Sequence, residues 1–147
     1  MKKIATSLLL VLVFIGCQQG VTKTDITKLN GYWEIEKVVR PQGEDKVYGI
    51  NESFDYFQVD TAGIGIRQKV MPQLNGRFLT NDTHEDVRVK WRQNKTYIDY
   101  KTGYAKWSEE IVKLTDTELV LKNDQDKEYH YKKTEKIDLL GDGKTNP

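Results

Sequence analysis

Few residues of this 147-residue chain have a type and spacing that could do chemistry. It contains one cysteine, Cys17, and two histidines, His84 and His130, which lie far apart in the sequence. A zinc site would need carboxylates gathered around the histidines, and no spacing indicates one, so we expect no metal and no cofactor. Glu109 and Glu110 are adjacent, and because neighbours on a strand point to opposite faces they cannot act as a pair. We therefore expect the chain not to be an enzyme.

Glu109 on its own leaves two readings open. Its spacing places it on the same strand face as Trp107 and Ile111, where it would be an interior carboxylate with a raised pKa. The alternative, which we favour, is a solvated residue at the edge of the strand. An enzyme that uses Glu109 as a general base is the last of three functional hypotheses.

Cys17 follows a segment laid out like an export signal. Lys2 and Lys3 precede a mainly apolar run of about a dozen residues, 4–15. This run is too short to cross a bilayer, which takes roughly 20 apolar residues, but it fits a signal peptide that is removed after export. The ending Gly16-Cys17 resembles the lipobox of bacterial lipoproteins, with Phe14 where leucine is most frequent. The resemblance implies cleavage after Gly16, acylation of Cys17 and attachment to a membrane through lipid.

The residue after Cys17 bears on the membrane that would hold the protein. In the sorting rule of enteric bacteria an aspartate there retains a lipoprotein in the inner membrane, so Gln18 favours the outer membrane, with the domain facing the periplasm. Loss of residues 1–16 removes Lys2 and Lys3 and leaves 21 basic and 22 acidic residues, a net charge of −1. A nearly neutral domain argues against a nucleic-acid partner.

Composition divides the remaining chain into three parts. We expect residues 17–28 to be the lipidated cysteine and a flexible tether, because they hold no apolar period. We expect residues 29–137 to form one folded domain and residues 138–147 to be a disordered tail. The domain contains no cysteine, so its stability must come from its core rather than from a disulfide.

Short runs of alternating apolar and polar residues dominate the expected domain. Such runs are typical of half-buried strands, and turn signals at regular spacing predict a sandwich or a barrel. The runs expected as strands are 32–40, 54–59, 63–70, 87–91, 96–100, 118–121 and 128–132. For 104–114 we favour a strand over a helix. This strand would need a bulge, because Leu114 falls out of phase with Trp107 and Ile111. We expect 76–85 to be a loop or a short edge strand.

The first expected strand opens with Gly31-Tyr32-Trp33, a Gly-x-Trp motif that resembles the hallmark of the lipocalins. Residues 113–133 also resemble the C-terminal half of the lipocalin-like domains of bacterial lipoproteins, although the other lipocalin motifs are not recognisable. The resemblance covers about 29–133 and implies an all-β fold, a single up-and-down antiparallel barrel of about eight strands. In lipocalins this Trp closes the barrel floor under a basic side chain, for which Lys132 and Lys133 are the candidates.

A barrel would place alternate side chains inside. The expected inward set is Trp33, Ile35, Phe57, Val59, Ile64, Ile66, Val87, Val89, Trp91, Ile98, Tyr100, Trp107, Leu119, Leu121, Tyr129 and Tyr131. Large aromatic side chains with polar tips suit the rim of a pocket, so we expect Tyr56, Tyr100, Tyr104 and Trp107 to bind a ligand.

Two functions fit such a barrel better than catalysis does. We expect a carrier that binds a small hydrophobic or amphipathic molecule in the cell envelope. The alternative is a filled barrel that binds another envelope protein through the loops 41–53 and 71–86. A cavity of about 300 Å³ or more with an open mouth would favour the carrier, and a packed interior would favour the scaffold.

Overall fold

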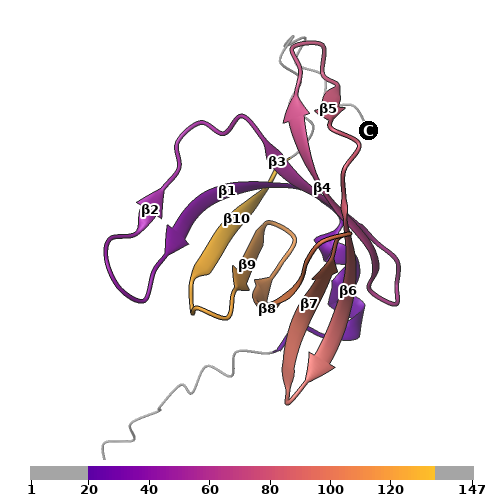
Figure 1. Cartoon of the computed structure of the whole chain (residues 1–147), viewed down its shortest axis with the longest axis vertical. Helices are drawn as coiled ribbons and strands as arrows, with labels where there is room; N and C mark the ends of the chain where they lie inside the picture. Colours follow the sequence, from indigo (N-terminus) through magenta and orange to yellow (C-terminus); the bar gives the residue numbers. More distant parts are fainter. Residues whose placement is uncertain (1–19, 135–147) are drawn as a thin grey trace, which may run out of the picture.

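Eight antiparallel strands form a closed ring in which each strand pairs with the next along the chain (Figure 1). The computed structural model describes residues 20–134. The ring consists of β1 (Gly31–Val39), β3 (Phe54–Val59), β4 (Ile64–Pro72), β6 (Glu85–Arg92), β7 (Lys95–Lys101), β8 (Lys106–Leu114), β9 (Glu118–Lys122) and β10 (Glu128–Thr134). The pairing of β10 with β1 closes it. The predicted up-and-down antiparallel barrel is therefore confirmed.

Two short strands lie outside the ring. β2 (Lys46–Val47) pairs with the end of β1, and β5 (Phe78–Thr80) pairs with the end of β4. Both belong to segments that stand out from the barrel in Figure 1. β5 confirms the short edge strand expected within 76–85. Within residues 20–134, no helix has the length and apolar character needed to cross a membrane.

β8 is a strand with a bulge, as predicted for 104–114. Its register with β9 shifts between Ile111 and Lys113, so one extra residue is inserted there. Ile111 and Leu114 are both buried, at 4% and 8% exposure. The bulge is the reason that these two residues can face the same side despite their odd spacing.

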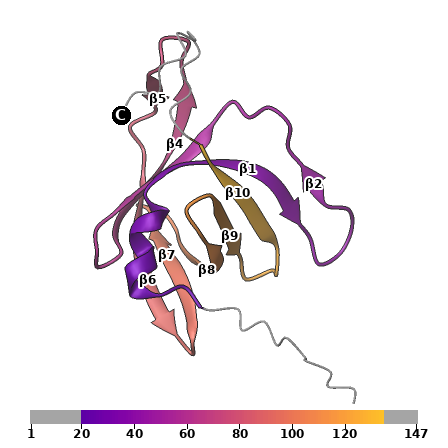
Figure 2. The ribbon, with the colours of Figure 1, turned by 180° about the vertical axis from the view of Figure 1, so that it is seen from behind.

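A short 3₁₀ helix, η1 (Lys23–Leu29), covers one end of the barrel (Figure 2). Ile26 and Leu29 are fully buried and Val21 is nearly so. The predicted tether over 17–28 is therefore wrong from Val21 onward, and residues 17–19 lie outside the described part of the chain. The segment contains too few apolar residues to show a period, and Ile26 and Leu29 are buried against the barrel end that η1 covers.

We call the end that η1 covers the floor, and the opposite end, where β6 begins at Glu85, the rim. Trp33 stands on the floor and donates from Nε1 to the carbonyl oxygen of Leu29 at 2.8 Å. The Asn30 side chain joins η1 to β3: its Nδ2 donates to the carbonyl of Val59 at 3.0 Å, and its Oδ1 accepts from the Val59 N–H at 2.6 Å. These bonds fix the entry of the chain into β1.

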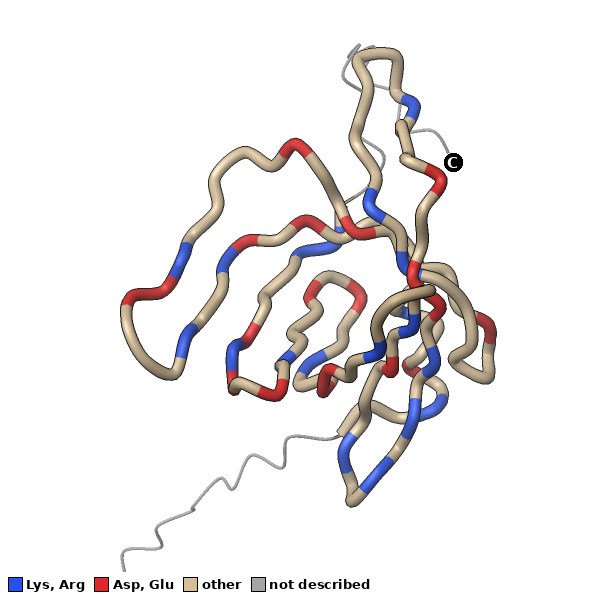
Figure 3. Tube along the Cα trace, viewed as in Figure 1, with Lys and Arg blue, Asp and Glu red and all other residues tan. Residues whose placement is uncertain are grey.

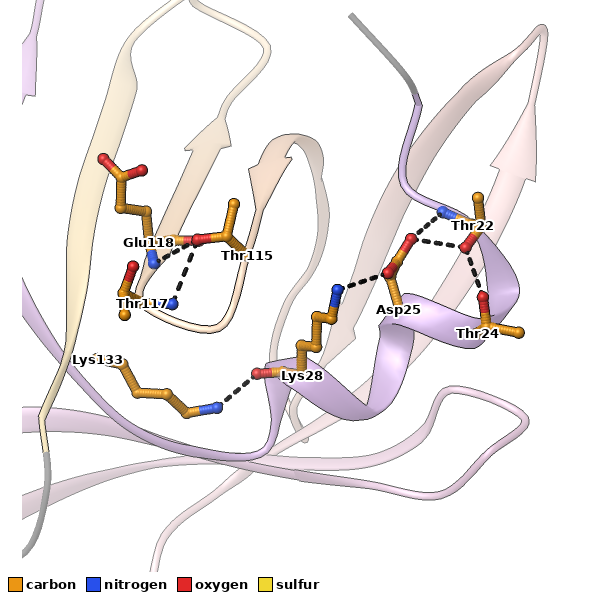
Figure 4. A network of polar contacts seen from close by, with 8 residues as sticks. All are labelled: Thr22, Thr24, Asp25, Lys28, Thr115, Thr117, Glu118 and Lys133. Atoms are coloured by element: carbon orange, nitrogen blue, oxygen red, sulfur yellow. Dashed lines mark hydrogen bonds and ion pairs between the residues drawn. The ribbon is translucent and has the colours of Figure 1, made fainter.

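Polar contacts hold the outside of the floor (Figure 4). The Asp25 carboxylate accepts from the N–H and the hydroxyl of Thr22, and Lys28 Nζ lies 2.8 Å from its Oδ1. Lys28 and Thr22 together lower the pKa of Asp25 to about 2. Lys133 Nζ donates to the carbonyl oxygen of Lys28 at 2.7 Å and so ties η1 to β10.

A cluster of buried side chains fills the interior of the barrel from the floor toward the rim. Most of the predicted inward set belongs to it or packs against it. Its members are Val21, Ile26, Leu29, Trp33, Phe57, Val59, Val87, Val89, Ile98, Tyr100, Ile111, Leu114, Leu119, Leu121 and Tyr131. Trp91 is 38% exposed because it lies where β6 leaves the barrel.

The inward face predicted for β4 is wrong. Gly65 and Arg67 pair with the inward residues Val59 and Phe57 of β3, so Ile64 and Ile66 face outward. Ile64 is 46% exposed. Side chains alternate with a period of two, so a choice of the wrong phase moves the whole apolar set to the other face.

Candidate functional site

Arg67 is the centre of a group of charged side chains inside the barrel toward the rim. It lies directly across from Glu85 in the register of β4 with β6, and its Nε donates to Glu85 Oε2 at 3.0 Å. The Arg67 side chain is 14% exposed and that of Glu85 is 22% exposed. Solvent therefore reaches this group, but only in part.

Three further side chains, Asp55, Tyr100 and Glu109, lie around Arg67 and Glu85. We call these five residues the Arg67 cluster. Arg67 Nε lies 3.7 Å from Asp55 Oδ1, and Arg67 Nη1 lies 3.9 Å from Glu109 Oε2. The guanidinium carbon lies 4.7 Å from the centroid of the Tyr100 ring, a cation–π distance. Because Glu109 is on β8, the arginine reaches across the interior from β4.

Three buried polar atoms of the cluster have no hydrogen-bond partner among the described residues. They are Asp55 Oδ1, Glu109 Oε2 and the hydroxyl oxygen of Tyr100. Buried polar atoms are usually paired, because each unsatisfied group costs about 1–3 kcal/mol. Two of the three are carboxylate oxygens, which accept hydrogen bonds and cannot donate when ionised. The cluster can therefore accept hydrogen bonds from a molecule that enters it.

The charges of the cluster are only partly balanced. Burial raises the pKa of Glu109, although contact with Tyr100 and the charge of Arg67 oppose this rise. Burial also raises the pKa of Tyr100 well above its usual value, and the nearby Glu109 adds to that effect. Burial alone would lower the pKa of Arg67, but Tyr100, Asp55 and Glu85 together raise it. Arg67 is therefore a permanent cation, and Glu109 is the carboxylate whose charge the site tolerates least.

Glu109 corrects one of our two readings. We favoured a solvated edge residue, but Glu109 is buried at 9% exposure and faces the interior. The strand bulge begins after Ile111, so Glu109, Trp107 and Ile111 keep the same face. The interior reading is therefore the one that the structure supports.

Two of the four predicted ligand-binding aromatics lie together and two do not. The rings of Tyr100 and Trp107 stack with centroids 5.0 Å apart and planes inclined by 12°. Tyr104 lies in the β7–β8 turn and is fully exposed. Tyr56 pairs with Tyr32 on the outer face of the barrel, where their ring centroids are 4.8 Å apart. Tyr56 and Tyr104 therefore do not line the interior.

The predicted floor residues lie as follows. Lys133 Nζ is 5.1 Å from the centroid of the Trp33 ring. Lys132 faces outward, with Nζ 3.3 Å from Glu34 Oε2. Gly31 has φ +120°, and a Cβ there would lie 3.0 Å from Cε of Lys133, so the position favours glycine. Gly16 and Cys17 lie outside the described residues.

The two histidines lie apart from the Arg67 cluster. His84 Nε2 is 3.6 Å from Asp86 Oδ1 near the start of β6, and His130 Nε2 is 3.2 Å from Glu128 Oε2 on β10. Within residues 20–134, no group of three or more His, Cys, Asp or Glu side chains is arranged to hold a metal ion.

An open groove of about 670 Å³ is lined by residues of β4, β6, β7 and β8, and Tyr100 and Trp107 are among them. Its polar lining is largely paired within itself: Asp99 contacts Lys90 at 2.9 Å and accepts from the Ser108 hydroxyl at 2.6 Å. Asp99, Lys90 and Ser108 therefore satisfy one another. The Arg67 cluster, with three unpaired buried atoms, is the stronger candidate for a binding site.

The sequence analysis did not predict Asp55, Arg67 and Glu85 as site residues. Arg67 occupies the polar phase of β4, between Ile66 and Gln68, and was therefore placed outside with the other charged residues. The available signal was Gly65, because a Cβ at that position would lie 1.9 Å from the carbonyl oxygen of Gln58. A glycine in a strand interior often marks a close approach of backbone, and here it lies in the same phase as Arg67.

Comparison with known proteins gives a likeness of fold only. No protein-family model and no curated protein matches the chain. A lipocalin-like protein from Bacteroides uniformis ATCC 8492 is similar in structure, with 13% identity over 73% of this chain and 99% of that chain and a TM-score of 0.48. An uncharacterized protein from Bacteroides eggerthii DSM 20697 has 14% identity over 72% and 99%, with a TM-score of 0.46.

Proposed function

We propose that this protein is a lipid-anchored lipoprotein of the bacterial cell envelope whose barrel binds a small amphipathic molecule at the Arg67 cluster. The role is one of binding rather than catalysis. The observation that carries the proposal is the set of buried atoms without a hydrogen-bond partner, Asp55 Oδ1, Glu109 Oε2 and the Tyr100 hydroxyl, beside the stacked rings of Tyr100 and Trp107. The two carboxylate oxygens contact Arg67 only at ion-pair distances of 3.7 and 3.9 Å.

The chemistry of the cluster limits the kind of molecule that fits it. Unpaired carboxylate oxygens accept hydrogen bonds, so the polar part of the ligand carries amine, amide or hydroxyl donors. An anionic ligand would meet three carboxylates, Asp55, Glu85 and Glu109, against two cations, Arg67 and Lys69, and like charges repel. The half-buried Trp107 presents a flat apolar surface beside the polar atoms. A donor-bearing aromatic or apolar compound matches both features.

Two probes that share a ring and differ in charge test this chemistry. Tryptamine and indole-3-acetate both carry an indole, but the first bears an ammonium and the second a carboxylate. A ligand that binds only the folded state raises the melting temperature with its concentration. We expect tryptamine to raise the melting temperature of the mature Cys17→Ser chain more than indole-3-acetate does at equal concentration. Equal shifts, or a larger shift with the acid, would contradict the proposed ligand class.

The anchor rests on the segment that ends in Gly16-Cys17 and on the general effect of acylation. Each buried acyl methylene contributes about 0.8 kcal/mol, so two or more chains anchor a protein stably. We expect labelled palmitate to be incorporated into the wild-type chain, and globomycin, which blocks the lipoprotein signal peptidase, to stop its maturation. A Cys17→Ala chain that still partitions with membranes like the wild type would contradict the anchor.

The interaction module remains a second candidate, because the loops named for it expose large apolar side chains. Ile50 and Val47 in the 41–53 loop are 100% and 76% exposed, and Leu74 in the β4–β5 turn is 77% exposed. A photo-crosslinker at Ile50 or Leu74 in intact cells, with Lys127 as the control position, tests it. A specific adduct from the two loops and not from Lys127 supports this module, and the same adducts from all three positions argue against it.

A further inference from the structure

The first described residues lie across the β6–β7 hairpin at the floor end of the barrel (Figure 2). The carbonyl oxygen of Val21 accepts hydrogen bonds from Trp91 Nε1 at 3.1 Å and from Thr96 Oγ1 at 3.0 Å. A Cβ on Gly20 would lie 3.7 Å from the carbonyl oxygen of Asn94, which is in the hairpin turn. The chain therefore enters the domain beside the tip of this hairpin.

The tip has a fixed shape. Arg92 and Lys95 pair across it, so only Gln93 and Asn94 form the turn. Their φ angles are +49° and +62°. A two-residue turn with both φ angles positive matches the twist of the flanking strands and is a favoured hairpin connection. Side chains next to this turn are therefore held in defined positions.

Basic residues are frequent in the hairpin, and Figure 3 marks their positions on both of its arms. The stretch 87–97 contains four basic residues and no acidic one. With Lys23 and Trp91, these residues form what we call the basic tip: Lys23, Arg88, Lys90, Trp91, Arg92 and Lys95. Arg88 is the member farthest from the turn and lies opposite Asp99 of β7.

Acidic neighbours balance the basic tip only in part. Asp99 pairs with Lys90 at 2.9 Å and also contacts Arg92. Glu110 pairs with Lys95 at 3.0 Å. Two acidic partners therefore face five basic residues. The side chains of Lys90, Arg92 and Lys95 remain close to half exposed.

Trp91 gives the basic tip an apolar component. It is 38% exposed, and Lys23 Nζ lies 5.6 Å from the centroid of its ring. Tryptophan is enriched at the boundary between membrane and water, where long basic side chains reach from apolar surroundings to the headgroups. The basic tip has this combination of residues.

Acylation of Cys17, as proposed above, would bring the basic tip to the membrane. Cys17 is three residues before Gly20. Each residue of a fully extended chain spans at most about 3.6 Å, so the two Cα atoms lie within about 11 Å of each other for any path between them. Lipid on Cys17 would be buried in the hydrocarbon. The hairpin tip beside Gly20 would then be held at the depth of the headgroups.

We infer that the basic tip docks on anionic phospholipid headgroups in the leaflet that holds the anchor. This inference rests on the proposed acylation of Cys17, which supplies the attachment. Because the tip and η1 share the floor end, docking turns the rim away from the bilayer. The Arg67 cluster, which includes the rim residue Glu85, then faces the aqueous phase, where a water-borne ligand can reach it.

Vesicle binding of a chain without lipid tests the tip independently of the anchor. The mature Cys17→Ser chain is mixed with phosphatidylcholine vesicles that contain or lack phosphatidylglycerol, and the bound fraction is measured by sedimentation. We expect binding only to the vesicles with phosphatidylglycerol, and we expect high salt to remove it. Each basic side chain near an anionic surface contributes about a fivefold increase in partitioning.

A charge-matched pair of variants locates the contact. The tip variant removes four basic residues and is expected to bind about tenfold or more weakly: Arg88→Gln, Lys90→Gln, Arg92→Gln and Lys95→Gln. The control variant has the same net charge but changes residues elsewhere: Lys46→Gln, Arg77→Gln, Lys106→Gln and Lys127→Gln. Tip binding predicts that the control stays within about twofold of the parent chain. Equal losses in both variants, or a parent chain that binds both kinds of vesicle alike, would overturn it.

Two additional readouts keep the test decisive. Circular dichroism checks that the tip variant is folded. If it is not, the dependence of parent-chain binding on salt and on phosphatidylglycerol still tests the inference. Palmitate labelling reports on the anchor alone. Normal acylation without selective vesicle binding would contradict the basic tip only, and selective vesicle binding without acylation would contradict the anchor only.

Discussion

Lys133 holds its Nζ 5.1 Å from the centroid of the Trp33 ring and donates from the same nitrogen to the carbonyl oxygen of Lys28. One side chain thus joins β10, β1 and the helix that covers the floor. Burial lowers the pKa of Lys133, because partial desolvation makes the charged form of this side chain less favourable. The contact stabilises the closed end of the barrel.

Loss of this contact should weaken the fold. We expect Lys133→Met to lower the free energy of unfolding by about 1–2 kcal/mol, because it removes a cation–π contact and a charge-assisted hydrogen bond. Lys132→Met is the matched control. Its salt bridge with Glu34 is half exposed and is expected to contribute less than about 1 kcal/mol. Urea unfolding of both variants checks this, and equal losses would contradict it.

The helix that covers the floor gives a second prediction. Ile26 is fully buried in the floor of the barrel, so Ile26→Ala should cost about 3 kcal/mol. Thr24→Ala on the exposed side of η1 should change stability by no more than about 0.5 kcal/mol. Chemical unfolding measures both, and a neutral Ile26→Ala would mean that residues 21–29 are a tether after all.

Arg67 contacts three carboxylates, and Lys69 contacts one of them, Asp55, at 2.9 Å, so loss of Arg67 should be costly at neutral pH chiefly through Glu85 and Glu109. We expect Arg67→Met to destabilise the protein by about 2–3 kcal/mol at pH 7, because an uncompensated charge group is left partly buried. The loss should shrink as the pH falls, because burial raises the pKa of Glu109, which then becomes neutral and leaves no charge for Arg67 to balance at that position. Arg77→Met in the β4–β5 hairpin controls for loss of one arginine. A loss that does not change with pH would argue against the charge explanation.

Glu109→Gln should stabilise the protein at neutral pH, whereas Arg67→Met should destabilise it. Burial raises the pKa of Glu109 in the folded state above its usual value, so the folded protein binds this proton more tightly than the unfolded chain does. The stability from the protonated form is fully present below the unfolded pKa and is lost as pH rises through the folded pKa. Glutamine stays neutral, so the variant should melt at a higher temperature than the wild type at pH 7 and at the same temperature at about pH 4.

Glu110→Gln is the matched control for that prediction. Its carboxylate faces outward and pairs with Lys95 at 3.0 Å and Lys122 at 3.7 Å. We expect no gain in melting temperature at either pH. A gain of the same size in both variants would show that the change in net charge, and not the interior position of Glu109, is responsible.

Alternation in the sequence was sufficient to predict the strands and the barrel, but it did not predict for every strand which face is buried. β6 could be assigned because Val87 and Val89 are apolar and Arg88 and Lys90 are charged. In β4 the apolar residues Ile64 and Ile66 face outward and the charged residue Arg67 faces inward. On the outer face, Phe54 of β3 and Val70 of β4 pair in register, and both are buried. The pattern within one strand does not show which of its faces will point into the barrel.

The site was predictable only in part for the same reason. Tyr100 lies on an alternating strand and Trp107 precedes the bulge of β8, and the prediction that both face inward agrees with their stacking. Arg67 and Asp55 are far apart in sequence and meet only because β3 and β4 pair in one register. Tyr104 was misplaced because the turn between β7 and β8 follows Lys101, earlier than the aromatic spacing suggested.

The most direct test of the Arg67 cluster as a binding site is native mass spectrometry of the mature Cys17→Ser chain, exported with an ordinary signal peptide and purified without detergent. Three forms are compared: the parent chain, Asp55→Asn with Glu109→Gln, and Asp99→Asn with Glu110→Gln as a charge-matched control outside the barrel. We predict a bound small molecule, or bound tryptamine when it is added, on the parent and the control but not on the cluster variant. The same bound mass on all three forms, or none on any of them, would contradict the account.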